Sequence, residues 1–394
     1  MIAAAPRLYT LPFGLLCLSQ MLFASSFTMI LPELPSYLSS LGGEDFKGLI
    51  IALFTLTAGL SRPFSGKLSD TVGRVPIMIF GTLVCVVCSL LYPLISSVLG
   101  FLLLRFFHGL STGFKPTAST AYVADIAPPA RRGEALGILS MSMNMGGALA
   151  PAFGSWLAQA TSLNTMFMVS SGVALLSIAI LVGLRETLSK KEPFHPRLLI
   201  LSRKEVIEPS ALDPAVVTAL VYLGYGALLT VIPDQSEYFG LRNKGWFFSI
   251  FTLFSLVSRF VSGKMSDRYG RAPVLKIGMF LVAISMALMG AVQSGVGLLI
   301  ASAALGFAHG VVGPALFAWA IDRSVDERRG RAVGTVYIAL EFGIGLGALS
   351  SAWLYDNQAQ HFDRTFYVLG VFTFCGFLYL FRKGLRGEKS LQIN

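Results

Sequence analysis

The sequence predicts an all-α integral membrane protein with twelve transmembrane helices, arranged as two pseudo-symmetric six-helix bundles. Its composition, the spacing of its apolar stretches and an internal repeat all indicate this class. Of 394 residues, 54% are hydrophobic and 13% are charged, and the mean hydropathy is +0.69. Soluble domains carry charged residues at about a quarter of their positions, so most of this chain is expected to lie in lipid.

Apolar stretches follow one another along the whole chain, each roughly as long as the ~20 residues that an α-helix needs to cross the hydrocarbon core. The first is too long for a signal peptide and lacks a small-residue cleavage site, so we expect it to remain in the mature protein. In chain order, the expected spans are residues 8–31, 48–64, 75–95, 98–123, 135–157, 165–184, 214–233, 246–262, 277–294, 297–321, 332–354 and 365–381.

The positive charges are distributed unevenly among the segments that join these spans. With the amino terminus inside, four of the 31 Lys and Arg residues fall in outer loops and four within spans, and the others are cytoplasmic. This bias follows the positive-inside rule, and it places both termini in the cytoplasm of a cell-membrane protein. We therefore expect an N-terminal bundle over residues 1–184, a cytoplasmic loop over 185–213 and a C-terminal bundle over 214–394.

The sequence offers little to other classes of function. The net charge is +10, but no basic patch with interleaved aromatic residues is available to bind nucleic acid. Cys85 and Cys88 have CxxC spacing, which in a lipid-embedded helix indicates packing rather than metal or redox chemistry. The sequence contains no P-loop, nucleotide fingerprint or metal-ligand cluster. We expect no cofactor, no metal and no catalytic residues, and we expect the protein to act as a monomer.

A charged, glycine-containing phrase occurs twice, 197 positions apart. Residues 66–76 read GKLSDTVGRVP, and residues 263–273 read GKMSDRYGRAP. A slip of four residues aligns a second pair of phrases, His108-Gly109 and His309-Gly310. We therefore expect the two halves to share one order and one orientation of helices, about an axis along the membrane normal. The offset of 197 also relates Ser61-Arg62 to Ser258-Arg259, Asp125 to Asp322, RRG at 131–133 to 328–330, and Gly137 to Gly334.

The first phrase resembles the signature loop of the major facilitator superfamily. The resemblance covers the whole chain, and it implies the major facilitator fold and transport of a small molecule by alternating access. It also implies that the aspartate of the loop contacts the start of the eleventh helix and that the arginine contacts an acidic residue at the end of the fourth. Both contacts would close the cytoplasmic side of the outward-open state. The residues concerned are Gly66, Asp70, Gly73, Arg74, Pro76 and Asp125, repeated as Gly263, Asp267, Gly270, Arg271, Pro273 and Asp322.

A second phrase, NMGGALAPAFGS at residues 144–155, resembles the glycine-proline motif of antiporters in this family. Its matching residues are Gly147, Pro151 and Gly154, whereas Ala150 and Ser155 stand where the pattern prefers glycine. The resemblance favours export of a drug or metabolite. The alternative is purely structural, because small residues let helices pack backbone to backbone and a proline bends a helix.

The fourth span carries a polar stripe made of Arg105, His108, Thr112, Lys115 and Ser119. These positions recur at intervals of three and four, so they lie within roughly 80° of one another on a helix. Because two cations facing lipid would be prohibitively costly, we expect the stripe to face the central cavity. The stripe also resembles the family's R-x-x-Q-G pattern, which implies a role in proton coupling for Arg105, although His108 replaces the glutamine.

Glu341 lies near the middle of the eleventh span, one turn beyond Tyr337 and aligned with Asn144 of the other half. A carboxyl group at such a depth is either paired with a cation such as Lys115 or protonated for part of the transport cycle. Glu341 is therefore the first candidate for proton exchange.

Other polar residues have competing interpretations. Glu33 and Asp234 follow helix-ending prolines near the outer face, and we expect them to be wetted gate or rim residues and the next candidates for proton exchange. Arg62 and Arg259 lie one turn before their loops, where snorkelling to the headgroups is favoured over substrate binding. His309 either lines the substrate cavity or satisfies a hydrogen bond between helices. Candidates for the apolar walls of the substrate cavity are Tyr222, Tyr225 and Trp319.

Together these features predict a proton-coupled exporter of a small amphipathic solute. The alternatives are proton-coupled uptake by symport and a membrane receptor or enzyme built on a similar bundle. Arg105, Lys115 and two histidines against Glu341 predict a positive cavity, and hence an anionic or zwitterionic solute, because a cation would lack a compensating charge at low dielectric. The expected partners are this solute, protons and the lipid bilayer.

Overall fold

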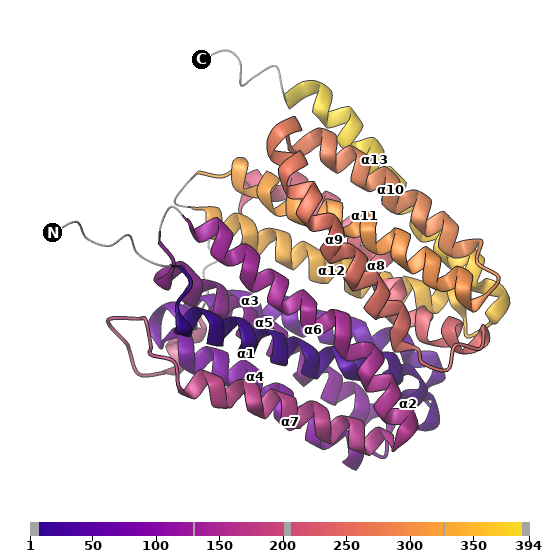
Figure 1. The fold of residues 1–394 in the computed structure, drawn as a ribbon, viewed down its shortest axis with the longest axis horizontal. Helices are drawn as coiled ribbons and strands as arrows, with labels where there is room; N and C mark the ends of the chain where they lie inside the picture. Colours follow the sequence, from indigo (N-terminus) through magenta and orange to yellow (C-terminus); the bar gives the residue numbers. More distant parts are fainter. Residues whose placement is uncertain (1–7, 129–130, 201–205, 326–327, 388–394) are drawn as a thin grey trace.

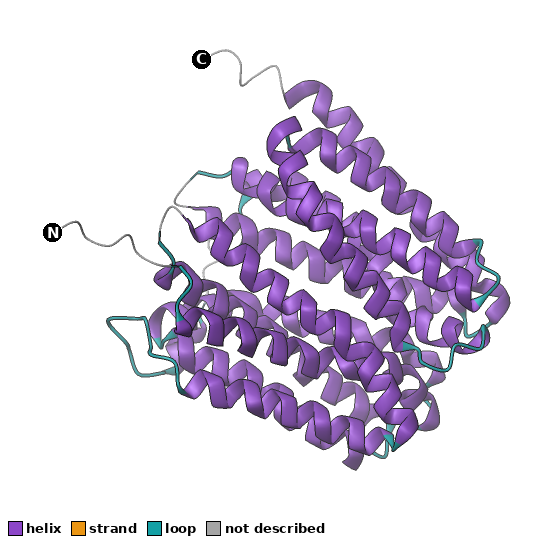
Figure 2. Cartoon of the chain, viewed as in Figure 1, coloured by secondary structure: helices purple, strands orange, loops and turns teal. Residues whose placement is uncertain are grey.

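The computed structural model describes residues 8–128, 131–200, 206–325 and 328–387. Within these ranges the chain consists of α-helices and short 3-10 turns joined by loops, and it contains no strand (Figure 2). The all-helical class predicted from the sequence is therefore confirmed.

In the first half of the described chain, three long helices begin at a hydroxyl side chain that accepts a hydrogen bond from a backbone N–H of the first turn. These N-cap residues are Thr10, Ser97 and Ser162, and they satisfy donors that a helix start leaves unpaired. The elements of this half are α1 (Leu11–Ile30), η1 (Leu31–Glu33), α2 (Leu34–Ser40), η2 (Glu44–Phe46), α3 (Lys47–Thr71), α4 (Arg74–Leu91), η3 (Tyr92–Leu94), α5 (Val98–Ile126), α6 (Arg132–Ala160) and α7 (Leu163–Val182).

The second half follows the same order of long helices. Ser294 caps α11 as Ser97 caps α5, and the two caps are separated by the same 197 positions as the repeated phrase. The elements of this half are η5 (Pro196–Leu199), η7 (Pro209–Ala211), α8 (Leu212–Tyr238), α9 (Gly245–Tyr269), α10 (Arg271–Gly290), α11 (Gly295–Asp322), α12 (Arg329–Tyr355), η9 (Ala359–His361) and α13 (Phe362–Gly387).

Each expected span overlaps one long helix of the described chain. Eleven helices in the described residues are long and apolar enough to cross a membrane. α5 is not among them, although it is 29 residues long, because the polar stripe interrupts its apolar sequence. Whether α5 is a twelfth span therefore depends on whether its polar side chains are shielded from lipid by the rest of the protein.

The repeated phrase lies partly in helix and partly in a tight turn. α3 continues to Thr71, and Gly73 then adopts a φ of 136° before α4 begins. In the second copy, α9 continues to Tyr269 and Gly270 adopts a φ of 87°. Residues with a Cβ rarely adopt such values, so this position of the phrase requires glycine.

Close helix contacts repeat at the same offset. A Cβ on Gly109 of α5 would collide with the backbone of Phe54 on α3, and a Cβ on Gly306 of α11 would collide with the backbone of Phe251 on α9. Gly109 and Gly306 are 197 positions apart, as are Phe54 and Phe251. The four-residue slip that aligned Gly109 with Gly310 is therefore wrong at this point of the fold.

Two helix pairs make the most extensive contacts between the halves, α3 with α12 and α6 with α9. Their tightest contacts lie at the end opposite both termini, where Gly48 packs on the backbone of Ala348 and Gly245 packs on the backbone of Pro151. Figure 1 shows α6 and α9 converging toward that end, away from the marked N and C. The two contacts are again related by the offset of 197.

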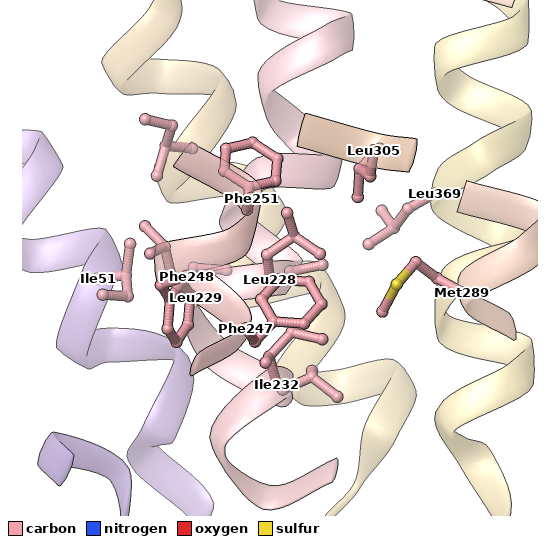
Figure 3. Packing of buried hydrophobic residues seen from close by; sticks show 14 of the residues in the cluster. Ile51, Leu228, Leu229, Ile232, Phe247, Phe248, Phe251, Met289, Leu305 and Leu369 are labelled. Atoms are coloured by element: carbon pink, nitrogen blue, oxygen red, sulfur yellow. The ribbon is translucent and has the colours of Figure 1, made fainter. Parts of the chain in front are cut away.

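A single apolar cluster continues across the α3 side of this interface. Figure 3 shows Ile51 of α3 beside Phe248 of α9 and Leu229 of α8. Ile51 is 3% exposed. Because lipid is as apolar as these side chains, their close packing rather than exclusion of water holds the halves together here.

Candidate functional site

A buried ion pair joins the two halves within the α3–α12 interface. Nη2 of Arg62 lies 2.6 Å from Oε1 of Glu341, and the side chains are 11% and 9% exposed. Gly59, one turn before Arg62, makes room for the contact, because a Cβ there would lie 3.3 Å from the Cβ of Glu341. The guanidinium carbon of Arg62 also lies 4.3 Å from the ring centroid of Tyr337. A cation from one half thus neutralises a carboxylate from the other.

The expectation for Arg62 is wrong, because its guanidinium does not snorkel to the headgroups but turns into the protein and binds Glu341. Glu341 is paired with a cation, which was one of the two alternatives expected for it. The cation is Arg62 and not the suggested Lys115, whose Nζ donates to Ser19 and Gln20 of α1. Arginine occurs at equivalent positions of both halves, as Arg62 and Arg259. Snorkelling alone does not require this equivalence, so the repeat could have indicated that these arginines turn into the protein.

Arg259, the counterpart of Arg62, also turns into the protein rather than toward the headgroups. A Cβ on Gly313 of α11 would lie 3.6 Å from Nη2 of Arg259 and 4.0 Å from the hydroxyl of Tyr222 on α8. Nε of Arg259 is buried and has no hydrogen-bond partner among the described residues. The snorkelling interpretation is therefore wrong for both arginines.

The halves differ at the position that would place a carboxylate beside Arg259. The counterpart of Glu341 is Asn144, whose side-chain amide donates to the carbonyl of Ser140 in its own helix at 2.7 Å. Among the described residues, Arg62 has a carboxylate partner and Arg259 has none. The pseudo-symmetric scaffold thus carries an asymmetric set of charges.

Three aromatic rings surround His309 of α11. Its ring centroid lies 5.9 Å from that of Tyr222, 5.9 Å from that of Tyr225 and 5.4 Å from that of Phe251. His309 is 6% exposed, and its Nε2 has no hydrogen-bond partner in the described part of the chain. The Nε2 atom of His309 therefore does not support the alternative in which this side chain serves to make a hydrogen bond between helices.

The aromatic cluster lies partly on α8, the helix that packs beside the ion pair. The hydroxyl of Tyr222 and Nη2 of Arg259 both approach Gly313, and one turn before Tyr222 the backbone of Ala219 packs on Gly343 of α12. Trp319, also expected in the wall, packs against the main apolar cluster and lies against Arg323, whose guanidinium carbon is 5.8 Å from the tryptophan ring. The residues that meet at the interface thus come from α3, α8, α9, α11 and α12.

The polar stripe of α5 points into the N-terminal half. Arg105 is 1% exposed, and it donates from Nε to the carbonyl of Ile50 at 2.9 Å and from Nη1 to the hydroxyl of Tyr92 at 3.3 Å. Nδ1 of His108 lies 3.2 Å from the same hydroxyl. Both side chains find their partners within one half, so the expectation that they face the space between the halves is wrong.

The other side chains of the stripe also point into the N-terminal half. Nζ of Lys115 donates to the hydroxyl of Ser19 at 3.2 Å and to Oε1 of Gln20 at 3.0 Å, and Ser119 donates to the same oxygen at 3.1 Å. Thr112 donates to a carbonyl of its own helix. A buried lysine is thus held by neutral polar groups inside one half, which is why the stripe contributes no charge to the interface.

Charged residues also join the halves at the end opposite the termini. Nζ of Lys47 lies 2.5 Å from Oδ2 of Asp234, and both side chains are 11% exposed. Lys244 lies 2.6 Å from a carboxylate oxygen of Glu237 and 2.6 Å from the hydroxyl of Ser36. Asp234 therefore lies at a rim, as expected, but it is paired and largely buried rather than wetted.

The glycine-proline motif of α6 contacts both halves. Gly154 packs on the backbone of α1, and Ser155 donates to Glu33, which is 8% exposed. Glu33 is thus buried, and the expectation of a wetted rim residue is wrong. On the other side of α6, a Cβ on Gly147 would lie 3.8 Å from the methyl group of Thr252 on α9.

Arg74 binds two carboxylates at the end near the termini. Its Nε lies 3.1 Å from Asp125, and its Nη1 lies 2.7 Å from Asp70. The contact with Asp125 is the one that the resemblance implies. The side chain of Asp70 is 69% exposed and pairs within its own loop, whereas the resemblance implies a contact with the start of α12.

The second copy of the loop repeats part of this arrangement. Nε of Arg271 lies 3.0 Å from Asp322, and its Nη1 donates to Ser266 at 3.1 Å. The side chain of Asp267 lies outside the described residues. Arg74 and Arg271 thus bind equivalent aspartates at the ends of α5 and α11.

Glu186, in the loop after α7, was not among the predicted residues. Its two carboxylate oxygens accept from the backbone N–H groups of Arg74 at 3.0 Å and Val75 at 3.1 Å. A carboxylate at a helix start satisfies unpaired donors and is favoured by the helix dipole. Because the partners are more than a hundred positions apart in the chain, no local sequence pattern indicates this cap.

Comparison with known proteins identifies one family. Residues 16–212 and 214–392 match the Major Facilitator Superfamily. The chain is 24% identical over 336 residues to an uncharacterized MFS-type transporter of Methanocaldococcus jannaschii, covering 83% of this chain and 86% of the relative. It is 27% identical over 328 residues to the multidrug resistance protein MdtG of Salmonella typhimurium, covering 79% of this chain and 80% of the relative.

Two solved structures share the fold. The human organic anion transporter MFSD10 (TETRAN) has a TM-score of 0.73 at 20% identity, covering 93% of this chain and 98% of that one. A D-xylose-proton symporter has a TM-score of 0.77 at 16% identity, covering 93% of this chain and 96% of that one. At these identities the likeness concerns the fold alone. Because the family match extends over both halves of an all-helical chain, this protein is a multi-pass membrane transporter that belongs to the Major Facilitator Superfamily.

Proposed function

We propose that this protein is a proton-coupled exporter, an antiporter that moves a small amphipathic solute out of the cell in exchange for protons. The observation that carries the proposal is the buried ion pair between Arg62 and Glu341, because a carboxylate at low dielectric must be either paired or protonated. In this proposal twelve spans form two six-helix bundles, over residues 1–184 and 214–394, and one chain is the working unit. We assign no catalytic group and no cofactor to the activity.

The positive-inside rule supports an inward-facing state. It places both termini in the cytoplasm, so the contacts of Gly48 with α12 and of Gly245 with α6 lie at the outer face. The ion pair between Lys47 and Asp234 lies at the same face. With these contacts made, the solute enters from the cytoplasm. Opening outward requires them to separate and requires Asp70 to approach the start of α12.

Protonation of Glu341 supplies the coupling step. It converts the ion pair into a neutral acid beside the buried guanidinium of Arg62. Removing one partner of a buried pair costs about 3–5 kcal/mol, enough to change the ratio of two conformations by roughly a hundredfold or more. Arg105 is held by Ile50 and Tyr92 and so contributes only through the packing of its own half. We therefore assign proton exchange to Glu341.

Two observations support export. The antiporter-like motif of α6 contacts α9 through Gly147 and Pro151 and contacts α1 through Gly154, and one relative is named as a multidrug resistance protein. The same ion pair also supports a second candidate, proton-coupled uptake. An anion that took Arg62 from Glu341 would leave the carboxylate to bind a proton, and the two would cross together.

Transport by the purified protein in proteoliposomes tests the direction. Under an imposed pH gradient, antiport should accumulate radiolabelled amphipathic amino acids, carboxylates or amines on the acidic side, and symport should accumulate them on the alkaline side. Glu341→Gln should keep downhill exchange and lose the response to the gradient. Glu44→Gln is a matched control, because Glu44 is exposed at the opposite end from the termini. If Glu341→Gln still concentrates solute as the wild type does, proton exchange takes place elsewhere.

A further inference from the structure

Arg259 is a partly buried cation that has no carboxylate partner in the described part of the chain. Its Nε is buried and lacks a hydrogen-bond partner there, whereas buried polar groups are almost always hydrogen-bonded. Nε of its counterpart Arg62 also lacks one, but Arg62 binds Glu341 through Nη2. The corresponding residue of the other half, Asn144, carries no charge and is held by Ser140. Arg259 is thus suited to an acidic group that does not belong to this chain.

Glu341 offers the opposite charge in the same group of side chains. Its Oε1 accepts from Arg62 at 2.6 Å, which leaves Oε2 for a second donor. Tyr222 lies between the two charges, because its hydroxyl and Nη2 of Arg259 both approach Gly313, and α8 packs on α12 beside Glu341, where a Cβ on Gly343 would lie 2.5 Å from the carbonyl oxygen of Ala219. The other titratable groups around this carboxylate are Tyr337 of its own helix and, beyond Tyr222, His309 of α11. A ligand that contacts Tyr222 can therefore reach both the carboxylate of Glu341 and the guanidinium of Arg259.

We propose that the solute is an amphipathic zwitterion, whose acidic group binds Arg259 and whose ammonium group binds Glu341. This inference rests on the proposed function, because it takes the solute to the interface between the halves. The rings of Tyr222, Tyr225 and Phe251 lie around His309 and supply an apolar wall for a flat hydrophobic body.

The charges at the interface disfavour the two other classes of solute. A pure cation would pair with Glu341 but would add a third positive charge beside Arg62 and Arg259. A pure anion would bind Arg259 and leave the second oxygen of Glu341 without a donor. A zwitterion supplies a partner both to Arg259 and to Glu341, which limits the cost of desolvating these two groups.

The sign of proton exchange follows from the same contacts. An ammonium group binds only the ionised form of Glu341, so a zwitterion and a proton compete for this carboxylate. Such competition is what antiport requires. An anion, in contrast, favours the protonated form of Glu341 and is bound together with a proton. The class of solute and the direction of coupling are therefore linked through one carboxylate.

Three compounds with the same ring system test the proposal. Biphenylalanine carries both charges, 3-(4-biphenylyl)propanoate lacks the ammonium group, and 2-(4-biphenylyl)ethylamine lacks the acid. Binding to the purified full-length protein in detergent is measured by calorimetry, and proton release is measured with a pH indicator in weak buffer. We expect the zwitterion to bind at least about tenfold more tightly than either analogue, since each charged hydrogen bond contributes about that factor. At a pH low enough for Glu341 to be partly protonated in the free protein, binding of the zwitterion should release protons, and binding of the propanoate should take them up.

Variants separate the two contacts. Arg259→Gln should weaken the zwitterion and the propanoate alike, and Arg259→Lys should restore part of both affinities. Glu341→Gln should abolish proton release while Glu44→Gln keeps it. A propanoate that binds as tightly as the zwitterion, a zwitterion that does not bind, or proton release that survives in Glu341→Gln would each overturn the proposal. These equilibrium results do not depend on the direction of transport, so antiport can fail in proteoliposomes while the zwitterion site stands.

Discussion

Replacing Arg62 by glutamine should destabilise the protein through the buried charge that remains on Glu341. The charged atoms are 2.6 Å apart, a separation that gives about 6 kcal/mol of attraction at an effective dielectric constant of about 20. Desolvation offsets part of this attraction. We therefore expect Arg62→Gln and Glu341→Gln each to lower the free energy of unfolding by about 3–5 kcal/mol. The double variant carries neither charge and should lose much less than the sum.

A double-mutant cycle measures this interaction. Unfolding is followed by the loss of helical circular dichroism as SDS is added to mixed micelles, and the interaction energy should be at least about 2 kcal/mol. Arg131 and Glu134 provide a matched control, because they are 2.7 Å apart but 39% and 41% exposed. An exposed pair on one helix contributes about 0.5 kcal/mol or less. An interaction energy between Arg62 and Glu341 as small as the control value would refute the buried-pair reasoning.

Three further predictions concern the gates and the loops. Asp70→Asn should slow transport at least about tenfold, the equivalent of one charged hydrogen bond, without changing unfolding, and normal turnover of a well-folded variant would argue against the gate. Lys47→Gln should open the outer side of the protein. A cysteine introduced by Ala52→Cys should then react faster with a membrane-impermeant maleimide in the Lys47→Gln protein than in the protein with Lys47, and equal rates would argue against this gate. Glu186→Gln should lower the free energy of unfolding by about 1–2 kcal/mol through loss of the α4 cap, and an unchanged SDS midpoint would show that water replaces the carboxylate.

The helices and the repeat could be predicted from the sequence because both leave signals in residue order. Each apolar stretch has the length set by the bilayer, and the offset of 197 relates glycines that are fixed by backbone geometry, as Gly73 and Gly270 are by their φ values. Small residues at equivalent positions, such as Gly48 and Gly245, are needed because two backbones meet there. Such constraints act locally, so they can be recognised without knowing which helices are neighbours.

The direction of the polar side chains could not be predicted in the same way. Helical periodicity shows that Arg105 and Lys115 share a face of α5, but it does not show whether that face meets the other half or the interior of its own. The structure turns it inward, toward Ile50 and Gln20. For Arg62 the error had another source, because a position one turn from a loop allows both snorkelling and an inward turn.

The two seams between the halves are equivalent in backbone but not in charge, and this difference has a consequence for coupling. In the α6–α9 seam the contacts are made by Gly147, Pro151 and Gly245, and Asn144 binds its own helix. In the α3–α12 seam the equivalent position carries Glu341. A carboxylate in both seams would allow two protons to be bound per cycle at equivalent sites. In the described part of the chain only the α3–α12 seam carries an acid at this position. Under the proposed coupling through Glu341, one protonation would therefore change one side of the interface, and each proton would have a defined effect on which face of the transporter is open.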